Sequence, residues 1–186
     1  MQELETRILD IDVEDIKRKM IDLGGYKVKD EDQINKIFDF PDRRLLSEKG
    51  YARVRTVSDK LSNKIVYFMT TKKMLSQEKY KIMDENEIIV DDGDTAEKLF
   101  SSLGLTLVET IKKSRESYKY KNTLVEIDIN DKSYCPFPYI EIETAYEDEL
   151  KEVVEALGYS MGDTTSKTIY EILEERGLSK GTQKGL

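Results

Sequence analysis

The stretch TLVEIDINDKSYCPFPYIEIETA (residues 123–145) contains two segments in which apolar and polar residues alternate. Such alternation is typical of β-strands, because successive side chains of a strand point to opposite faces. The first segment would place Glu126 and Asp128 on one face, and the second would do the same with Glu141 and Glu143. The stretch therefore predicts two strands, each with a pair of carboxylates on one side and apolar residues on the other.

Six further segments alternate in the same way and predict further strands. They are rich in Ile, Val, Tyr and Thr, the residue types that favour strands. They are QELETRIL (2–9), INKIFDF (34–40), YARVRTV (51–57), NKIVYFMTT (63–71), KYKIMDENEIIV (79–90) and LVETIKKSRESYKY (107–120). With the two segments of the first stretch, we expect eight strands.

Four other segments carry apolar residues at helical spacing and predict helices. They lie near residues 13–23, 96–103, 149–157 and 165–176, and each is followed by a glycine. Glycine commonly ends a helix because it adopts the left-handed conformation without strain. No stretch rich in Pro, Gly or Ser divides the chain, so we expect one domain over residues 1–177 and a flexible tail over residues 178–186.

The composition excludes several classes of chemistry. The 186 residues include no His and one Cys, which rules out catalysis by Ser–His or Cys–His pairs, His-containing metal motifs and a disulfide framework. Lys and Arg total 30 against 38 Asp and Glu, and this net charge of −8 argues against general binding to nucleic acid or to an anionic membrane. No apolar run approaches the ~20 residues of a membrane helix, and the N-terminus does not read as a signal peptide. We therefore expect a cytoplasmic protein.

Charged side chains recur at alternate positions of the predicted strands, so they share a face. In an antiparallel sheet covered by helices on one side, such a face is commonly exposed to solvent. The charged groups are Glu3, Glu5 and Arg7; Arg53 and Arg55; Glu85 and Glu87; Lys113 and Arg115; and the two acidic pairs of the first stretch.

The same faces would acquire a function if the sheet closed into a barrel. Eight strands can close around one small ligand, with the apolar faces outward under the helices and the charged faces inside. Buried charges are costly unless they are paired or bound to ions, so this lumen would require a charged ligand. Arginine suits phosphate, and clustered carboxylates suit Mg²⁺ or Mn²⁺. Periodicity alone is compatible with both the solvated face and the lumen.

The order of the charged pairs resembles that of the CYTH superfamily, also called the triphosphate tunnel metalloenzymes. Residues 3–7, Glu-Leu-Glu-Thr-Arg, are similar to the N-terminal ExExK signature of that family. Residues 33–55 resemble its stretch in which a Phe-Asp-x-Pro strand and turn precede an Arg-x-Arg strand, and Lys72 lies where the family has a tunnel lysine. The remaining charged pairs follow in the family's order, and the resemblance covers about residues 2–175.

The resemblance implies an α+β fold, an eight-stranded antiparallel closed β-barrel that forms the triphosphate tunnel, with helices packed on the outside. It also implies an enzyme that uses Mg²⁺ or Mn²⁺ to act on a small triphosphate such as tripolyphosphate, ATP or thiamine triphosphate. The implied metal ligands are Glu3, Glu5, Asp128, Glu141 and Glu143. The implied phosphate-binding residues are Arg53, Arg55, Lys72, Lys113 and Arg115, and the expected catalytic residues are Glu5, Lys72 and Arg7.

Two positions depart from the family's pattern. Arg7 stands where the family has lysine, and because arginine stays protonated it can bind phosphate but cannot act as a general base. Met83 stands where many members carry arginine, and Lys81 on the same face would replace that charge. With no histidine, water activation would fall to a metal, a carboxylate or a lysine of lowered pKa such as Lys72.

Three functions are compatible with these motifs. We expect hydrolysis of an inorganic or organic triphosphate, because hydrolysis requires less of the site than cyclisation does. The alternatives are a class IV adenylyl cyclase that converts ATP to cyclic AMP and pyrophosphate, and a non-catalytic module that binds triphosphate or polyphosphate. We expect a monomer or a homodimer that binds neither nucleic acid nor a membrane.

Overall fold

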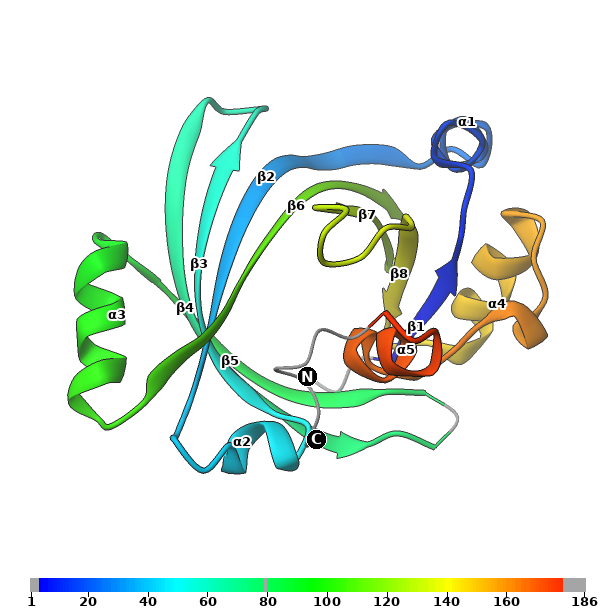
Figure 1. Cartoon of the computed structure of the whole chain (residues 1–186). Coiled ribbons are helices and arrows are strands. Elements are labelled where there is room, and N and C mark those ends of the chain that lie inside the picture. The colour runs from blue at the N-terminus through cyan, green and yellow to red at the C-terminus, as the bar shows by residue number, and fades with distance from the viewer. Residues whose placement is uncertain (1–3, 79, 179–186) are drawn as a thin grey trace.

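The computed structural model describes residues 4–78 and 80–178. Its eight strands form one antiparallel sheet with the order β1-β8-β7-β6-β2-β3-β4-β5, which confirms the predicted strand content. The sheet curls around a central space (Figure 1). The strands are β1 (Leu4–Leu9), β2 (Tyr26–Asp39), β3 (Tyr51–Asp59), β4 (Lys64–Ser76), β5 (Ile82–Val90), β6 (Thr106–Tyr120), β7 (Thr123–Asn130) and β8 (Tyr139–Thr144).

β2 is much longer than the sequence pattern predicts. It begins at Tyr26, whereas the alternation predicted a start near residue 34. The additional segment carries charged residues on both faces, so it shows no apolar periodicity. Its backbone is instead held by pairing with β6, where Glu31 lies opposite Arg115. This segment is therefore a strand because it pairs with β6, although its own sequence lacks the alternation typical of strands.

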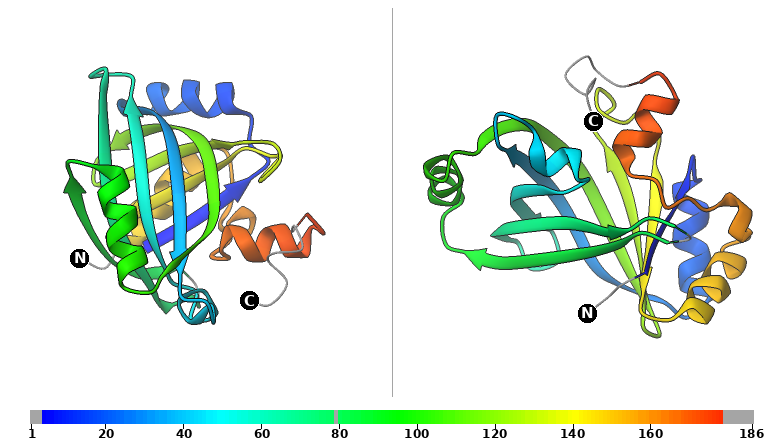
Figure 2. Two further views of the ribbon diagram at one scale, coloured as in Figure 1. Left: turned by 60° about the vertical axis from the view of Figure 1, so that its left-hand side comes forward. Right: turned by 90° about the horizontal axis from the view of Figure 1, so that it is seen from below.

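The barrel is open along one seam. β1 and β5 are the two edges of the sheet. Among the described residues they meet at one isolated bridge, in which Glu5 and Lys81 exchange backbone hydrogen bonds of 3.2 and 3.1 Å. Beyond Lys81, β5 follows β4 and leaves β1 (Figure 2). The eight-stranded antiparallel architecture is confirmed, whereas the expected closure is reduced to this bridge.

The helices of the described chain are α1 (Val13–Asp22), α2 (Arg44–Ser47), α3 (Gly93–Ser102), α4 (Glu147–Ala156), a 3-10 helix η1 (Met161–Asp163) and α5 (Ile169–Glu175). The four predicted helices correspond to α1, α3, α4 and α5, while the single turn of α2 is too short to show periodicity. The glycines that end α1, α3 and α4 have φ values of +88°, +90° and +86°, as expected for helix stops. No described helix has both the length and the apolar composition needed to span a membrane.

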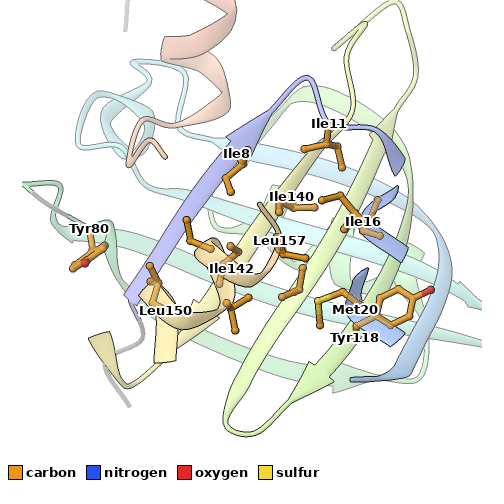
Figure 3. Packing of buried hydrophobic residues seen from close by; sticks show 14 residues of the cluster. Ile8, Ile11, Ile16, Met20, Tyr80, Tyr118, Ile140, Ile142, Leu150 and Leu157 are labelled. Atoms are coloured by element: carbon orange, nitrogen blue, oxygen red, sulfur yellow. The ribbon is translucent and has the colours of Figure 1, made fainter. Parts of the chain in front are cut away.

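The apolar faces of the strands pack against the helices on the outside of the sheet. Ile142 of β8 is buried together with Ile16 of α1 and Leu150 of α4 (Figure 3). A second cluster joins Val54 of β3 to Phe100 of α3. Because helices cover the outer face, the alternating charged residues point inward. Of the two arrangements compatible with the sequence pattern, the structure has the lumen.

Candidate functional site

The inner face of the curled sheet encloses a cavity of about 410 Å³. Side chains from all eight strands line this cavity, and α2 and α5 border it. The predicted site residues that line it are Glu5, Arg7, Arg53, Arg55, Lys72, Lys113, Arg115, Glu141 and Glu143. Glu3, also predicted as a metal ligand, lies outside the described residues.

Three carboxylates, those of Glu126, Glu141 and Glu143, form an acidic cluster on β7 and β8. One oxygen of each lies within 4.8 Å of the others. The strand register produces the cluster, because Glu126 lies opposite Glu141, and Glu143 follows on the same face of β8. Carboxylate oxygens at this spacing provide the donors and the negative charge that Mg²⁺ or Mn²⁺ prefers, so the cluster could hold a metal ion.

Glu143 differs from the other two carboxylates of this cluster, which contact arginine side chains. Among the described residues it forms no hydrogen bond or ion pair. Burial and the negative charges of Glu126, Glu5 and Glu141 raise the pKa of Glu143 to about 8. Ionisation of Glu143 is therefore unfavourable beside these carboxylates, and a bound cation would favour its charged form.

The raised pKa of Glu143 predicts that the stability of the ion-free protein falls as the pH rises towards 8. Between its ordinary pKa of 4.5 and its folded-state pKa of about 8, the folded protein holds a proton that the unfolded chain has released. Glu143→Gln has no proton to lose here, so it should flatten this part of the profile and raise the free energy of unfolding at pH 8. Urea denaturation with EDTA across this pH range measures the effect.

Glu155→Gln, on the exposed side of α4, is the matched control and should retain the wild-type slope. A Glu143→Gln profile as steep as that of the wild type would show that another group causes the pH dependence.

Asp128, also predicted as a metal ligand, lies outside the acidic cluster. It is fully buried and does not line the cavity. Nε and Nη2 of Arg115 each donate to it at 2.6 Å, and Lys113 Nζ donates at 2.6 Å. The strand register pairs Glu126, rather than Asp128, with Glu141. Both carboxylates lie on the same face of β7, and the register, which the sequence does not display, decides which of them reaches the cluster.

Arg7 lies between two carboxylates of the cavity wall. Its Nη2 contacts both Glu5 and Glu141. Burial disfavours the charged guanidinium, but the adjacent carboxylates of Glu141 and Glu5 outweigh this effect and raise the pKa of Arg7. Arg7 therefore remains protonated and does not act as a base.

The opposite wall of the cavity is cationic and comes from β3 and β4. Its charges, on Arg53, Arg55 and Lys72, face two carboxylates of β5. Glu87 accepts from Arg55 Nη2 at 2.9 Å and lies 3.3 Å from Arg53 Nη2, while Glu85 lies 2.8 Å from Lys72 Nζ. The Nε atoms of Arg53 and Arg55 are buried without a partner among the described residues. The three positive charges of this wall are thus balanced by only two carboxylates within it, so the wall could bind an anionic ligand.

Lys72 does not have the lowered pKa that was expected of a catalytic base. Burial favours the neutral amine, but the nearby Tyr51 and Glu85 favour the ammonium more strongly and raise the pKa of Lys72. The difference arises because Tyr51 and Glu85 lie directly opposite Lys72, in the β3–β4 and β4–β5 pairs respectively. Lys72 therefore places a positive charge at the cavity wall.

Lys81 joins the site although the family's motif does not include it. It is 6% exposed, lines the cavity, and its Nζ contacts Glu5. Burial and repulsion from Arg7 lower the pKa of Lys81, and burial and Arg115 do the same for Lys113. The sequence indicated Lys81 because Met83 stands where many family members carry arginine, and Lys81 lies two residues earlier on the same face.

A sequence model of the CYTH domain matches residues 1–169 of the chain. Among solved structures, the PH1012 protein of Pyrococcus horikoshii is 26% identical with a TM-score of 0.74, covering 89% of this chain and 96% of that chain. HpAC1 from Hippeastrum, described as a putative adenylyl cyclase with a dominant triphosphatase activity, is 15% identical with a TM-score of 0.69, covering 98% and 99%. A putative adenylate cyclase from Vibrio parahaemolyticus is 13% identical with a TM-score of 0.75, covering 94% and 98%. No curated protein matches the chain at a significant level.

Proposed function

The chain belongs to the CYTH domain family, and we propose that it is a metal-dependent enzyme that hydrolyses inorganic or organic triphosphates inside its curled sheet. The sorting of charge within one cavity carries this proposal. Carboxylates gather on β7 and β8, and arginine and lysine side chains gather on β3, β4 and β6. A triphosphate accompanied by a divalent cation presents both of the complementary charges.

The acidic cluster is the proposed site of Mg²⁺ or Mn²⁺. Glu126, Glu141 and Glu143 would hold the ion together with Glu5, which lies opposite Glu143 in the pairing of β1 with β8. Glu3 remains the proposed further ligand from the N-terminal acidic pair. When bound, the ion supplies positive charge to the phosphates and acidifies water.

The basic residues of the cavity would bind and orient the phosphates. Arg53, Arg55 and Arg115 offer planar forks that suit phosphate oxygens, and Lys72 and Lys113 add point charges. In binding, the ligand would take over the arginine contacts that the β5 carboxylates now occupy. Fixed cations stabilise the charge that develops on the leaving group, which is the main requirement of phosphoryl transfer.

A class IV adenylyl cyclase is the second candidate function. Tyr51, Tyr134 and Tyr170 line the same cavity as the cations, and aromatic side chains can stack against a nucleobase. Hydrolysis remains the preferred proposal because water needs no ribose hydroxyl to be aligned with a phosphate.

Turnover with defined substrates tests the proposal. Tripolyphosphate, ATP and thiamine triphosphate are each supplied with Mg²⁺, Mn²⁺ or EDTA, and phosphate, pyrophosphate and cyclic AMP are quantified. We expect phosphate release from at least one substrate, and its loss in EDTA. Cyclic AMP as the main product would establish the cyclase instead. Tight binding without any product would establish a binding module.

A further inference from the structure

Arg7 connects the acidic side of the cavity to the segment that leads into α5. Its backbone exchanges two hydrogen bonds of 2.9 Å with Thr165. Its Nη1 donates to the carbonyl oxygen of Lys167 at 2.8 Å, while its Nη2 contacts Glu5 and Glu141. One buried guanidinium thus holds two carboxylates on one side and the entrance to α5 on the other.

α5 in turn covers part of the site. Ile169 and Tyr170 in its first turn border the cavity. Ile172 and Leu173 pack over Cys135, which is 1% exposed. The position of α5 therefore determines both the shape of the cavity at this end and the access of solvent to the Cys135 thiol.

The contacts of Arg7 use two separate guanidinium nitrogens, Nη1 towards Lys167 and Nη2 towards the carboxylates. A guanidinium is a rigid fork with five N–H donors, whereas an ammonium is a single point charge. We propose that Arg7 is a positioning residue that aligns Glu5 and Glu141 and seats α5, so that the arrangement of these carboxylates depends on the seat of α5. The consequence for ion binding rests on the proposed function, whereas the seating of α5 does not.

The accessibility of the Cys135 thiol allows the packing of α5 to be measured in the intact protein, without an activity assay. Cys135 is the chain's single cysteine, so its rate of reaction with the thiol reagent DTNB reports how often α5 lifts away. Arg7→Lys should react about tenfold faster or more, the effect expected from losing a hydrogen bond to a charged group. Lys81→Gln removes another cationic partner of Glu5 without touching α5, and should react at the wild-type rate. A wild-type rate in Arg7→Lys overturns the proposal.

Coupling between α5 and the carboxylates is tested from the far end of the helix. Arg176, just beyond α5, pairs with Asp10 through contacts of 3.0 and 2.6 Å. Asp10 has a φ of +55°, which asparagine tolerates, so Asp10→Asn breaks the pair at an exposed site away from the cavity. We expect Asp10→Asn to weaken Mn²⁺ binding severalfold in the wild-type background and to have no further effect in Arg7→Lys.

The outcomes separate this inference from the proposed function. Equal weakening in both backgrounds, or no weakening in the wild type, would show that Arg7 does not transmit the position of α5. If Arg7→Lys does not fold, the Mn²⁺ affinity of Asp10→Asn alone tests the proposal. An affinity equal to that of the wild type would overturn it. A wild-type protein that binds no Mn²⁺ contradicts the proposed function, while the labelling rates still decide whether Arg7 seats α5.

Discussion

A protein in which Arg115 is replaced by methionine should lose about 3–5 kcal/mol of its free energy of unfolding, the range seen when one partner of a buried ion pair is removed. Arg115 donates to Asp128 through two nitrogens at 2.6 Å, to Glu141 at 2.8 Å, and also contacts Glu126. Asp128 and Glu126 are almost completely buried, so solvent cannot replace these contacts. Urea denaturation at pH 7 in EDTA measures the loss.

Two further proteins show whether the loss comes from these carboxylates. Arg18→Met removes an exposed arginine paired with Asp15 on the surface of α1, and should change stability little. Arg115→Met combined with Asp128→Asn should lose less than the sum of the two single changes, because both remove the same contacts. Strict additivity, or a single-variant loss no larger than that of Arg18→Met, would mean that the buried ion pairs do not stabilise the fold.

The strand content and the gathering of the charged residues on one face could be predicted because both depend on a local property, the alternation of residues along one strand. Alternation alone did not decide whether that face lines a lumen. The N-terminal part of β2 could not be predicted, because its charges lie on both faces and its partner β6 is far away in sequence. The same reason explains the composition of the acidic cluster. Glu126 and Asp128 are equivalent within their own strand, and the pairing with β8 alone distinguishes them.

The charge state of the site was less predictable than its residues. Lys72 was expected to have a lowered pKa, but its pKa depends on the groups that face it on the neighbouring strands, which are Tyr51 on β3 and Glu85 on β5. Burial and a nearby arginine lower the pKa of Lys81 and of Lys113. For Lys81 this arginine is Arg7, on β1. For Lys113 it is Arg115, two residues further along β6. The departure at Arg7 was visible in the sequence, whereas its contact with Lys167 required the fold.

Glu141→Gln should reduce both Mn²⁺ affinity and metal-dependent turnover by more than about 100-fold while the fold persists. Even residues that only support a metal ligand contribute about 10–100-fold to affinity, so the loss of the ligand itself should exceed this. Glu141 is the carboxylate of the cluster that also accepts from both Arg7 and Arg115. The fold should survive because Arg7 keeps Glu5 as a partner, and Arg115 keeps its contacts in β7.

Glu85→Gln is the matched control for this change. It removes the same charge from the same cavity, but on the cationic wall, where Glu85 faces Arg53 and Lys72. Its Mn²⁺ affinity, measured by calorimetry on the purified protein, should therefore stay within a few-fold of the wild type. If both variants lost Mn²⁺ affinity equally, the ion would be responding to the overall charge of the cavity. Loss confined to Glu141→Gln would instead identify the cluster on β7 and β8 as the place where the ion is held, because direct coordination depends on the position of a carboxylate and not only on its charge.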